Sequence, residues 1–238
     1  MARFSRPAPT PPRRSEPGLP NTGRLSQPAL QVLDLACGKG STAVEIARRL
    51  DAHVVGVDAF PEFLHAAGAS AARLRVSAQC QWVCADVRAY ADTCPFRCDV
   101  ALMIGLFPLA EAAPLLHALV RPGGIYLLDD AVRDPAHRRA SEFASTPDAA
   151  QCGSLINSLG DRVLHRVMLP KSSVASQART THARLASTAS GVAKSHPSLR
   201  PALRAFLLHH KKASAILRGP LRPTIWVVQR VQSERENR

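Results

Sequence analysis

The stretch VLDLACGKGSTAVEIARRL, residues 32–50, decides the fold. An apolar run ends in an aspartate, a loop of small residues with two glycines follows, and apolar residues then recur at helical spacing. A glycine-rich turn between a strand and a helix lets a nucleotide-like ligand approach the backbone closely. The sequence therefore predicts a ligand site at this turn, and the ligand remains to be identified.

The alternation of strand and helix patterns continues beyond this stretch. Strand patterns occupy residues 31–36, 53–58, 80–86, 99–107, 125–130, 162–170 and 224–231. Helical patterns occupy residues 41–50, 61–74, 111–120 and 146–160, and two more lie within 171–216, split by Pro197 and Pro201. Strands that alternate with helices predict an α/β fold, with a mostly parallel sheet covered on both faces.

The positive charge is concentrated at the two ends of the chain. The net charge is +13, and residues 170–238 carry 13 basic and two acidic residues, whereas residues 31–169 carry 13 basic and 15 acidic ones. We expect a disordered Pro/Arg-rich tail over 1–28, a core over 29–170, a basic helical insertion over 171–222, a final strand over 223–232 and a tail over 233–238. The insertion fits nucleic acid, an anionic membrane, an acidic substrate or simply a solvated helical face.

The cysteines do not predict a metal site. Cys80 and Cys84, like Cys94 and Cys98, have a wider spacing than zinc-binding pairs usually show, and Cys84 falls inside a predicted strand. We expect reduced thiols, no metal and a cytoplasmic location. Residues 1–28 contain no apolar targeting segment, and the longest apolar stretch, 101–120, contains an acid and two prolines, so no membrane span is predicted.

Asp34 selects among the ligands that such a turn can bind. A phosphate-binding P-loop needs a hydroxyl residue after its lysine, but Lys39 is followed by Gly40. Gly38, Gly40 and Ala43 match a dinucleotide fingerprint in form. However, the Asp34 carboxylate would repel a pyrophosphate by an energy on the order of several kcal/mol. The same carboxylate suits a ligand with an ammonium and a sulfonium group.

Residues 31–130 resemble the class I S-adenosylmethionine-dependent methyltransferase family. Five segments resemble its motifs in order, namely VLDLACGKG, VVGVDAF, CADV, DVALMIGLF and LVRPGGIYLLDD. The resemblance implies a Rossmann-like seven-stranded sheet, mostly parallel, in which TIWVVQR forms an antiparallel last strand after the helical insertion. It also implies S-adenosyl-L-methionine as the cofactor. Members of the family usually have one or two capping helices before the first motif, where this chain has a Pro-rich segment. The insertion over 171–222 is an alternative cover.

The resemblance assigns roles to the residues of the first turn. Asp34 would orient the methionine ammonium, and Gly38 and Gly40 would let the backbone approach the ligand. Ala36 replaces the first glycine of the motif. The alternative for the two glycines is a tight turn without a ligand, whereas Asp34, an acid at the end of a buried strand, needs a partner.

The resemblance also assigns the nucleoside contacts. Asp58 would bind both ribose hydroxyls, or alternatively cap the helix after it. Ala59 and Phe60 would line the faces of the adenine. Asp86 would accept a hydrogen bond from the adenine amino group and Val87 would offer a backbone N–H, or Asp86 is an ordinary loop acid.

The methyl acceptor is expected at the carboxyl ends of the fourth and fifth strands. Its predicted lining is Met103, Ile104, Gly105 and Leu106. Asp129 or Asp130 would act as a base or as an amine-binding carboxylate, and only one of the two should face the pocket because adjacent strand residues point to opposite sides. Alternatively, they cap the next turn.

The sequence predicts a methyltransferase that acts on a small molecule. IGLF after the fourth strand does not resemble the motif of base methyltransferases, and no cysteine stands where a cytosine methyltransferase needs its nucleophile. The alternatives are an RNA or protein methyltransferase that uses the basic insertion, a non-catalytic binding domain and a nicotinamide oxidoreductase. The acceptor, the atom methylated and the oligomeric state stay open.

Overall fold

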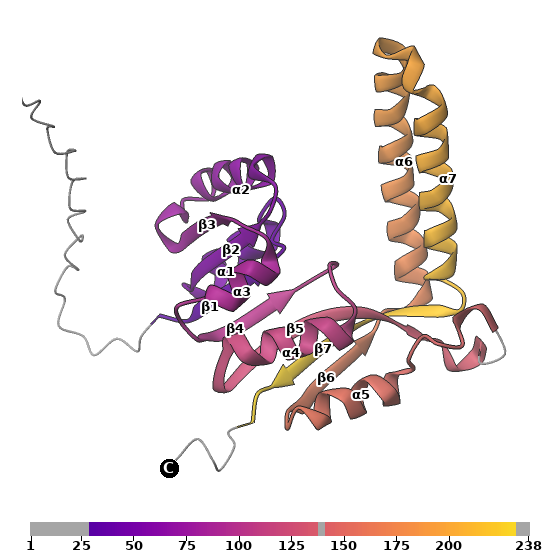
Figure 1. The fold of residues 1–238 in the computed structure, drawn as a ribbon. Coiled ribbons are helices and arrows are strands. Elements are labelled where there is room, and N and C mark those ends of the chain that lie inside the picture. The colour runs from indigo at the N-terminus through magenta and orange to yellow at the C-terminus, as the bar shows by residue number, and fades with distance from the viewer. Residues whose placement is uncertain (1–28, 138–140, 232–238) are drawn as a thin grey trace, which may run out of the picture.

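A computed structural model describes residues 29–137 and 141–231 (Figure 1). Its centre is a seven-stranded sheet with the order β3-β2-β1-β4-β5-β7-β6. The strands are β1 (Gln31–Leu35), β2 (His53–Asp58), β3 (Cys80–Cys84), β4 (Cys98–Met103), β5 (Val120–Arg133), β6 (Arg162–Met168) and β7 (Leu221–Gln229). The pairs among β1 to β5 are parallel, and β7 is antiparallel to both β5 and β6. The predicted fold class is confirmed.

Helices cover both faces of the sheet. They are α1 (Ser41–Leu50), α2 (Pro61–Arg73), α3 (Val87–Thr93), α4 (Leu109–Leu119), α5 (Ala149–Ser158), α6 (Lys171–Ser195) and α7 (Arg200–Ile216), with short 3₁₀ turns at Ser77–Gln79, Pro135–His137, Ser141–Phe143 and Pro197–Leu199. Val32 on β1 packs into a core with α1 and α2, whereas its neighbour Leu33 packs into the core with α4 and α5. This alternation buries both sides of the central strand.

The observed elements differ from the predicted ones near the ends of the strands. The strand predicted over 99–107 ends at Met103, because Gly105 takes a left-handed φ of +77° and turns the chain. Helix α3 was not predicted. The strand predicted over 125–130 runs from Val120 to Arg133. It begins earlier because Val120 pairs with Cys98 of β4, and it ends later because pairing with β7 continues to Arg133.

The insertion forms a helical hairpin, α6–α7, that projects away from the rest of the domain (Figure 1). It begins where β6 ends and leads into β7, so it stands at the edge of the sheet where β1 to β5 also end, which we call the carboxyl edge. Asp134, just after β5, anchors its base through Lys171 at 2.8 Å and Arg222 at 3.5 Å. Neither α6 nor any other helix in the described ranges combines the length and the apolarity that a membrane crossing requires.

Two of the predicted segments cannot be compared with the structure. The tails predicted over 1–28 and 233–238 lie outside the described residues. The helices of the insertion fall within residues 171–216, and the final strand begins at Leu221, two residues before its predicted start.

Candidate active site

The turn between β1 and α1 is tight and strongly left-handed. The φ angles are +58° at Ala36, +54° at Gly38 and +70° at Gly40. The Cys37 N–H donates to the Val57 carbonyl at 3.0 Å, which fastens the turn to the end of β2. Ala36, which stands in place of the motif's first glycine, takes a conformation that costs an L side chain about 1 kcal/mol.

The two glycines of the turn have different surroundings. A Cβ atom on Gly38 would meet nothing within 4 Å. A Cβ atom on Gly40 would lie 2.6 Å from the Ala67 Cβ and 2.7 Å from the Trp82 Cη2. Gly38 therefore leaves open space at the carboxyl edge, as a ligand would need, whereas packing alone requires a glycine at position 40.

Trp82 on β3 is a residue of this site that the sequence reasoning missed. Its ring would also lie 2.5 Å from a Cβ atom on Gly56, in the middle of β2. The indole therefore fills the space that two glycines vacate and sets how closely the first turn approaches the sheet. A glycine inside a strand often marks such a close approach, so Gly56 was the signal available in the sequence.

Asp34 lies at the end of β1 with an unsatisfied carboxylate. Its side chain is only 3% exposed, and Oδ2 has no hydrogen-bond partner among the described residues. The pKa of Asp34 is raised to about 7, chiefly because the carboxylate is buried; the backbone hydrogen bond from Ala43 lowers the pKa, and the charge of Asp58 contributes to raising it. A cation at this position would favour the ionised carboxylate and supply the missing partner.

Asp58 connects the first turn to the end of β2. Its Oδ2 accepts from the Gly38 N–H at 2.8 Å, and its Oδ1 accepts from the Phe60 N–H at 3.0 Å. The N-cap of α2 is Phe60, so Asp58 is not the cap of that helix. Each carboxylate oxygen accepts one backbone hydrogen bond and keeps capacity for another, which two neighbouring hydroxyl groups could use.

An exposed aromatic side chain follows Asp58 and Ala59. Phe60 is 60% exposed, and its ring centroid lies 5.4 Å from that of Phe63. The Lys39 ammonium lies 5.7 Å from the Phe63 ring. Phe60 therefore offers a flat apolar surface beside Asp58, where the resemblance places the adenine.

Asp86 has a structural role that the sequence analysis did not predict, since its alternative there was an ordinary loop acid. Its Oδ1 accepts from the backbone N–H groups of Arg88, at 2.9 Å, and Ala89, at 3.1 Å, and so caps α3. Both bonds use the same oxygen. Val87 is the first residue of α3, and its side chain is buried.

The part of the carboxyl edge where the methyl acceptor is expected, beyond β4 and β5, combines exposed apolar side chains with two carboxylates. Ile104 and Leu106 are 44% and 45% exposed. Met103, by contrast, packs into the core beside α4, because alternate residues of β4 face that helix, so its side chain does not line the edge as predicted.

Asp129 and Asp130 both bind the backbone of the loop after β4. Asp129 Oδ1 accepts from the Gly105 N–H at 2.7 Å. Asp130 Oδ2 accepts from the Leu109 N–H at 2.8 Å, at the start of α4, and its Oδ1 accepts from the Ala131 N–H at 2.7 Å. Asp130 therefore holds the end of the loop with one oxygen, and its other oxygen bonds to its neighbour on β5, whereas the bond to Gly105 occupies only one oxygen of Asp129.

The predicted site residues thus fall into two groups along the carboxyl edge. Asp34, Gly38 and Asp58 lie together between β1 and β2, and Gly105 lies with Asp129 beyond β4 and β5. Within the described ranges, no three His, Cys, Asp or Glu side chains are grouped closely enough to hold a metal ion.

Residues 32–124 match the family model described as "Methyltransferase domain". This match covers 93 of the 238 residues, so it shows that this part of the chain is similar to a methyltransferase domain. All of β1 except Gln31, strands β2 to β4 and the glycine turn after β1 lie within the matched range.

Two curated methyltransferases are similar to part of the chain. It is 35% identical over 119 residues to trans-aconitate 2-methyltransferase from Azoarcus sp. (strain BH72), a match that covers 48% of the chain and 45% of that protein. It is 37% identical over 106 residues to ribosomal protein L11 methyltransferase from Dechloromonas aromatica (strain RCB), covering 44% and 34%. The matches thus span less than half the length of these two curated relatives.

A solved structure shows the same fold over most of the chain. The S-adenosylmethionine-dependent methyltransferase from Thiobacillus denitrificans, in complex with S-adenosyl-L-homocysteine, has a TM-score of 0.71 at 20% identity, covering 84% of each chain.

Proposed function

We propose that this protein is an S-adenosylmethionine-dependent methyltransferase that acts on a small molecule. The observation that carries the proposal is the buried, unpartnered Oδ2 of Asp34, which lies at the end of β1 before the open space at Gly38. A buried carboxylate without a partner is costly, and an ammonium group is the chemical complement that it lacks.

The side chains around this space fit the rest of the cofactor. Asp34 would hold the ammonium of the methionine part, and Asp58 would accept hydrogen bonds from the two ribose hydroxyls. Ala59 and Phe60 would cover the adenine, and Asp86 and Val87 would approach its edge. When bound, the cofactor supplies an electrophilic methyl group on a sulfonium. The structural relative from Thiobacillus denitrificans, in complex with S-adenosyl-L-homocysteine, supports this choice.

The chain contributes to methyl transfer chiefly by positioning the acceptor. An in-line displacement gains most from the correct placement of the two reacting atoms. Ile104 and Leu106 would contact the apolar part of the acceptor, and Asp129 would hold a cationic or protonated group of it. Asp130 is a positioning residue in this scheme, because its bond to the Leu109 N–H fixes the loop that carries these side chains.

The proposal also specifies that the methyl acceptor is a small molecule rather than a macromolecule. The name of the relative from Azoarcus refers to a small carboxylic acid, and that of the relative from Dechloromonas to a ribosomal protein. An exposed apolar pair next to one available carboxylate oxygen suits an acceptor that has an apolar part and one polar group. The basic α6–α7 hairpin keeps a macromolecular acceptor as the second candidate.

Calorimetry with S-adenosyl-L-homocysteine tests the cofactor site. We expect Asp34→Ala and Asp58→Ala each to weaken binding by about tenfold or more, since each removes charged hydrogen-bond acceptors. Asp92→Ala, an exposed acid on α3, is the matched control and should bind like the natural protein. Equal binding by all four proteins would disprove the cofactor assignment, as would no binding by the natural protein.

A labelling experiment tests the acceptor. The purified protein is incubated with S-adenosyl-L-methionine labelled on its methyl group and a cell extract separated by size. We expect label in the small-molecule fraction, and none with Asp34→Ala. Label confined to RNA or protein, and falling as salt increases, would instead support the second candidate.

A further inference from the structure

The α6–α7 hairpin carries positive charge without any acidic counterpart. No Asp or Glu occurs between Asp161 and Glu234, and residues 171–218 contain nine Lys and Arg residues and four His residues. Acidic side chains normally accompany basic ones on a helical surface, where pairs three or four residues apart support the helix. Lys171 at the base pairs with Asp134 from outside the hairpin, and the hairpin itself supplies no acidic side chain.

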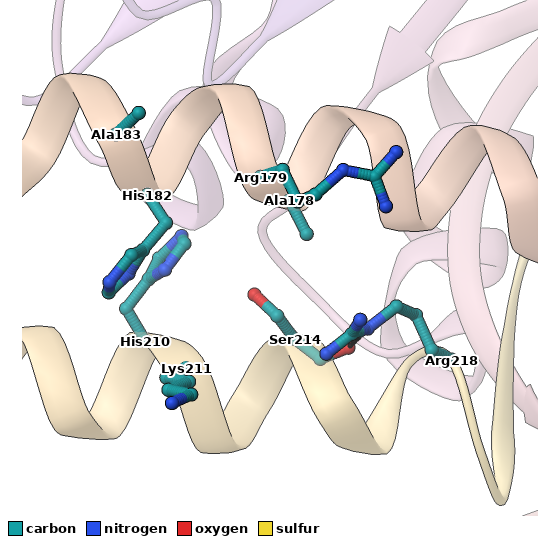
Figure 2. Close-up of a pocket in the computed structure, with 8 residues that line it drawn as sticks. All are labelled: Ala178, Arg179, His182, Ala183, His210, Lys211, Ser214 and Arg218. Atoms are coloured by element: carbon teal, nitrogen blue, oxygen red, sulfur yellow. Dashed lines mark hydrogen bonds between the residues drawn. The ribbon is translucent and has the colours of Figure 1, made fainter.

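The two helices of the hairpin leave a cavity between them. It has a volume of about 330 Å³ and is lined by Ala178, Arg179, His182, Ala183, His210, Lys211, Ser214 and Arg218. Figure 2 shows Ala178 and Ser214, both small, pointing into the gap between the helices. A second cavity, of about 260 Å³, shares Ala178, His210 and Ser214 with the first. The two helices of the hairpin are thus loosely packed around Ala178, His210 and Ser214.

Two histidines meet in this gap without hydrogen-bond partners. The rings of His182 from α6 and His210 from α7 are stacked, with centroids 5.7 Å apart and planes inclined by 23° (Figure 2). The Nδ1 atoms of both rings are buried and have no hydrogen-bond partner among the described residues. Buried nitrogen atoms of this kind are costly unless a ligand or a water molecule satisfies them.

Three cationic side chains line the same cavity. Arg179 comes from α6, Lys211 comes from α7, and Arg218 comes from the turn that follows α7. Within the described ranges, no ion pair involves any of the three. The Arg218 Nε donates to the Ser214 carbonyl at 3.0 Å, which fixes the side chain beside the cavity and leaves its terminal nitrogen atoms for a ligand.

We propose that this cavity binds the phosphate group of a small phosphorylated molecule. Arg179, Lys211 and Arg218 supply the positive charge, and the imidazoles of His182 and His210 supply hydrogen bonds at buried nitrogen atoms. A phosphate group carries close to two negative charges and several acceptor oxygens, so it can use donors from both helices at once. A carboxylate, with one charge and two oxygens, would leave part of this set unused.

The proposed phosphate site shares no residue with the candidate active site. Its histidine on α6, His182, follows Lys171, at the base of that helix, by eleven residues, which at the rise of an α-helix is about 17 Å. The proposal therefore does not depend on methyl transfer, and its test is a binding measurement on the full chain. Inorganic phosphate and a sugar phosphate are the probes, and they separate a free ion from a phosphate monoester.

The experiment follows the imidazole NMR signals of His182 and His210 while phosphate is added, with chloride at equal ionic strength as the comparison. We expect saturable changes with phosphate and none with chloride. Arg179→Gln and Arg218→Gln should each weaken binding by about tenfold or more, because each removes a charge next to the anion. Arg184→Gln is the matched control, since this exposed arginine on α6 does not line the cavity.

Circular dichroism of each variant shows whether the hairpin keeps its helices. Tighter binding of the sugar phosphate than of inorganic phosphate would support a phosphate monoester as the natural ligand, and equal binding would support the free ion. RNA and anionic lipid vesicles are added in parallel titrations. Three results would overturn the proposal: signals that do not saturate, an equal loss of binding in Arg184→Gln, or a response to RNA or to the vesicles with none to either phosphate probe.

Discussion

The glycine turn beside β1 and the α6–α7 hairpin are built on opposite physical principles. At the turn, Gly40 fits closely against Ala67 and Trp82, and the two acids beside it, Asp34 and Asp58, are buried. In the hairpin, Ala189 is the one buried side chain among those described on α6 and α7, and every charged side chain is basic. Substitutions at the turn should therefore act mainly through the shape of the side chain, and substitutions in the hairpin mainly through its charge.

The largest effect is expected from Gly40→Ala. The new Cβ would overlap Ala67 and Trp82, and the position has a left-handed φ, so we expect a loss of about 3 kcal/mol in the free energy of unfolding. Urea denaturation measures it. Gly68→Ala is the control, because its Cβ would be 3.8 Å from the Trp82 ring and α2 gains a better helix former. Equal losses in both variants would show that the turn is not closely packed.

Asp34→Asn should change how stability depends on pH. The pKa of Asp34, about 7 in the folded protein, lies above the ordinary value of 3.8, so the folded state binds the proton more tightly. This contribution is complete below about pH 4 and is lost as the pH rises through about 7. Without cofactor, the variant should therefore gain about 2 kcal/mol relative to the natural protein between about pH 5 and about pH 8.

Urea denaturation of both proteins at the two pH values tests this prediction. The other titrating groups are common to both proteins and cancel in the comparison. A stability difference that stays the same at both pH values would mean that Asp34 is already satisfied in the folded chain.

Gly38→Ala should weaken binding of the cofactor product while it lowers the stability of the fold only slightly. A Cβ at this position meets no protein atom, so only the left-handed φ opposes it, at a cost of about 1 kcal/mol. The same Cβ enters the space proposed for the cofactor, and S-adenosyl-L-homocysteine should bind about tenfold or more weakly by calorimetry. Unchanged binding would place the cofactor elsewhere.

The smallest change in stability is expected from filling the hairpin cavity. Ala178→Leu adds apolar volume where the helices are loosely packed, and we expect it to raise the free energy of unfolding by about 0.5 kcal/mol. It should also abolish the phosphate-dependent NMR changes. Ala205→Leu, on the exposed side of α7, should leave them intact. If Ala178→Leu destabilises the hairpin, its packing is already close.

Most of the fold could be predicted because it depends on local patterns. The apolar runs, the helical periodicity of residues 41–50 and the prolines that split the insertion all act over a few residues. The antiparallel last strand came from the family resemblance, since strand direction involves a partner far along the chain. The end of β4 was predicted four residues too late for the same reason, because distant carboxylates on β5 hold the loop that follows it.

By itself, the sequence determined the order of strands and helices, the glycine turn and the acids that follow β1 and β2, because each depends on near neighbours. Only the tertiary structure decided that close packing against Trp82, rather than a ligand, requires a glycine at position 40. It also decided that Asp34 has an unpaired oxygen and that the ring of His182 stacks on that of His210. Those facts depend on which distant side chains share a small volume, and packing in three dimensions sets that.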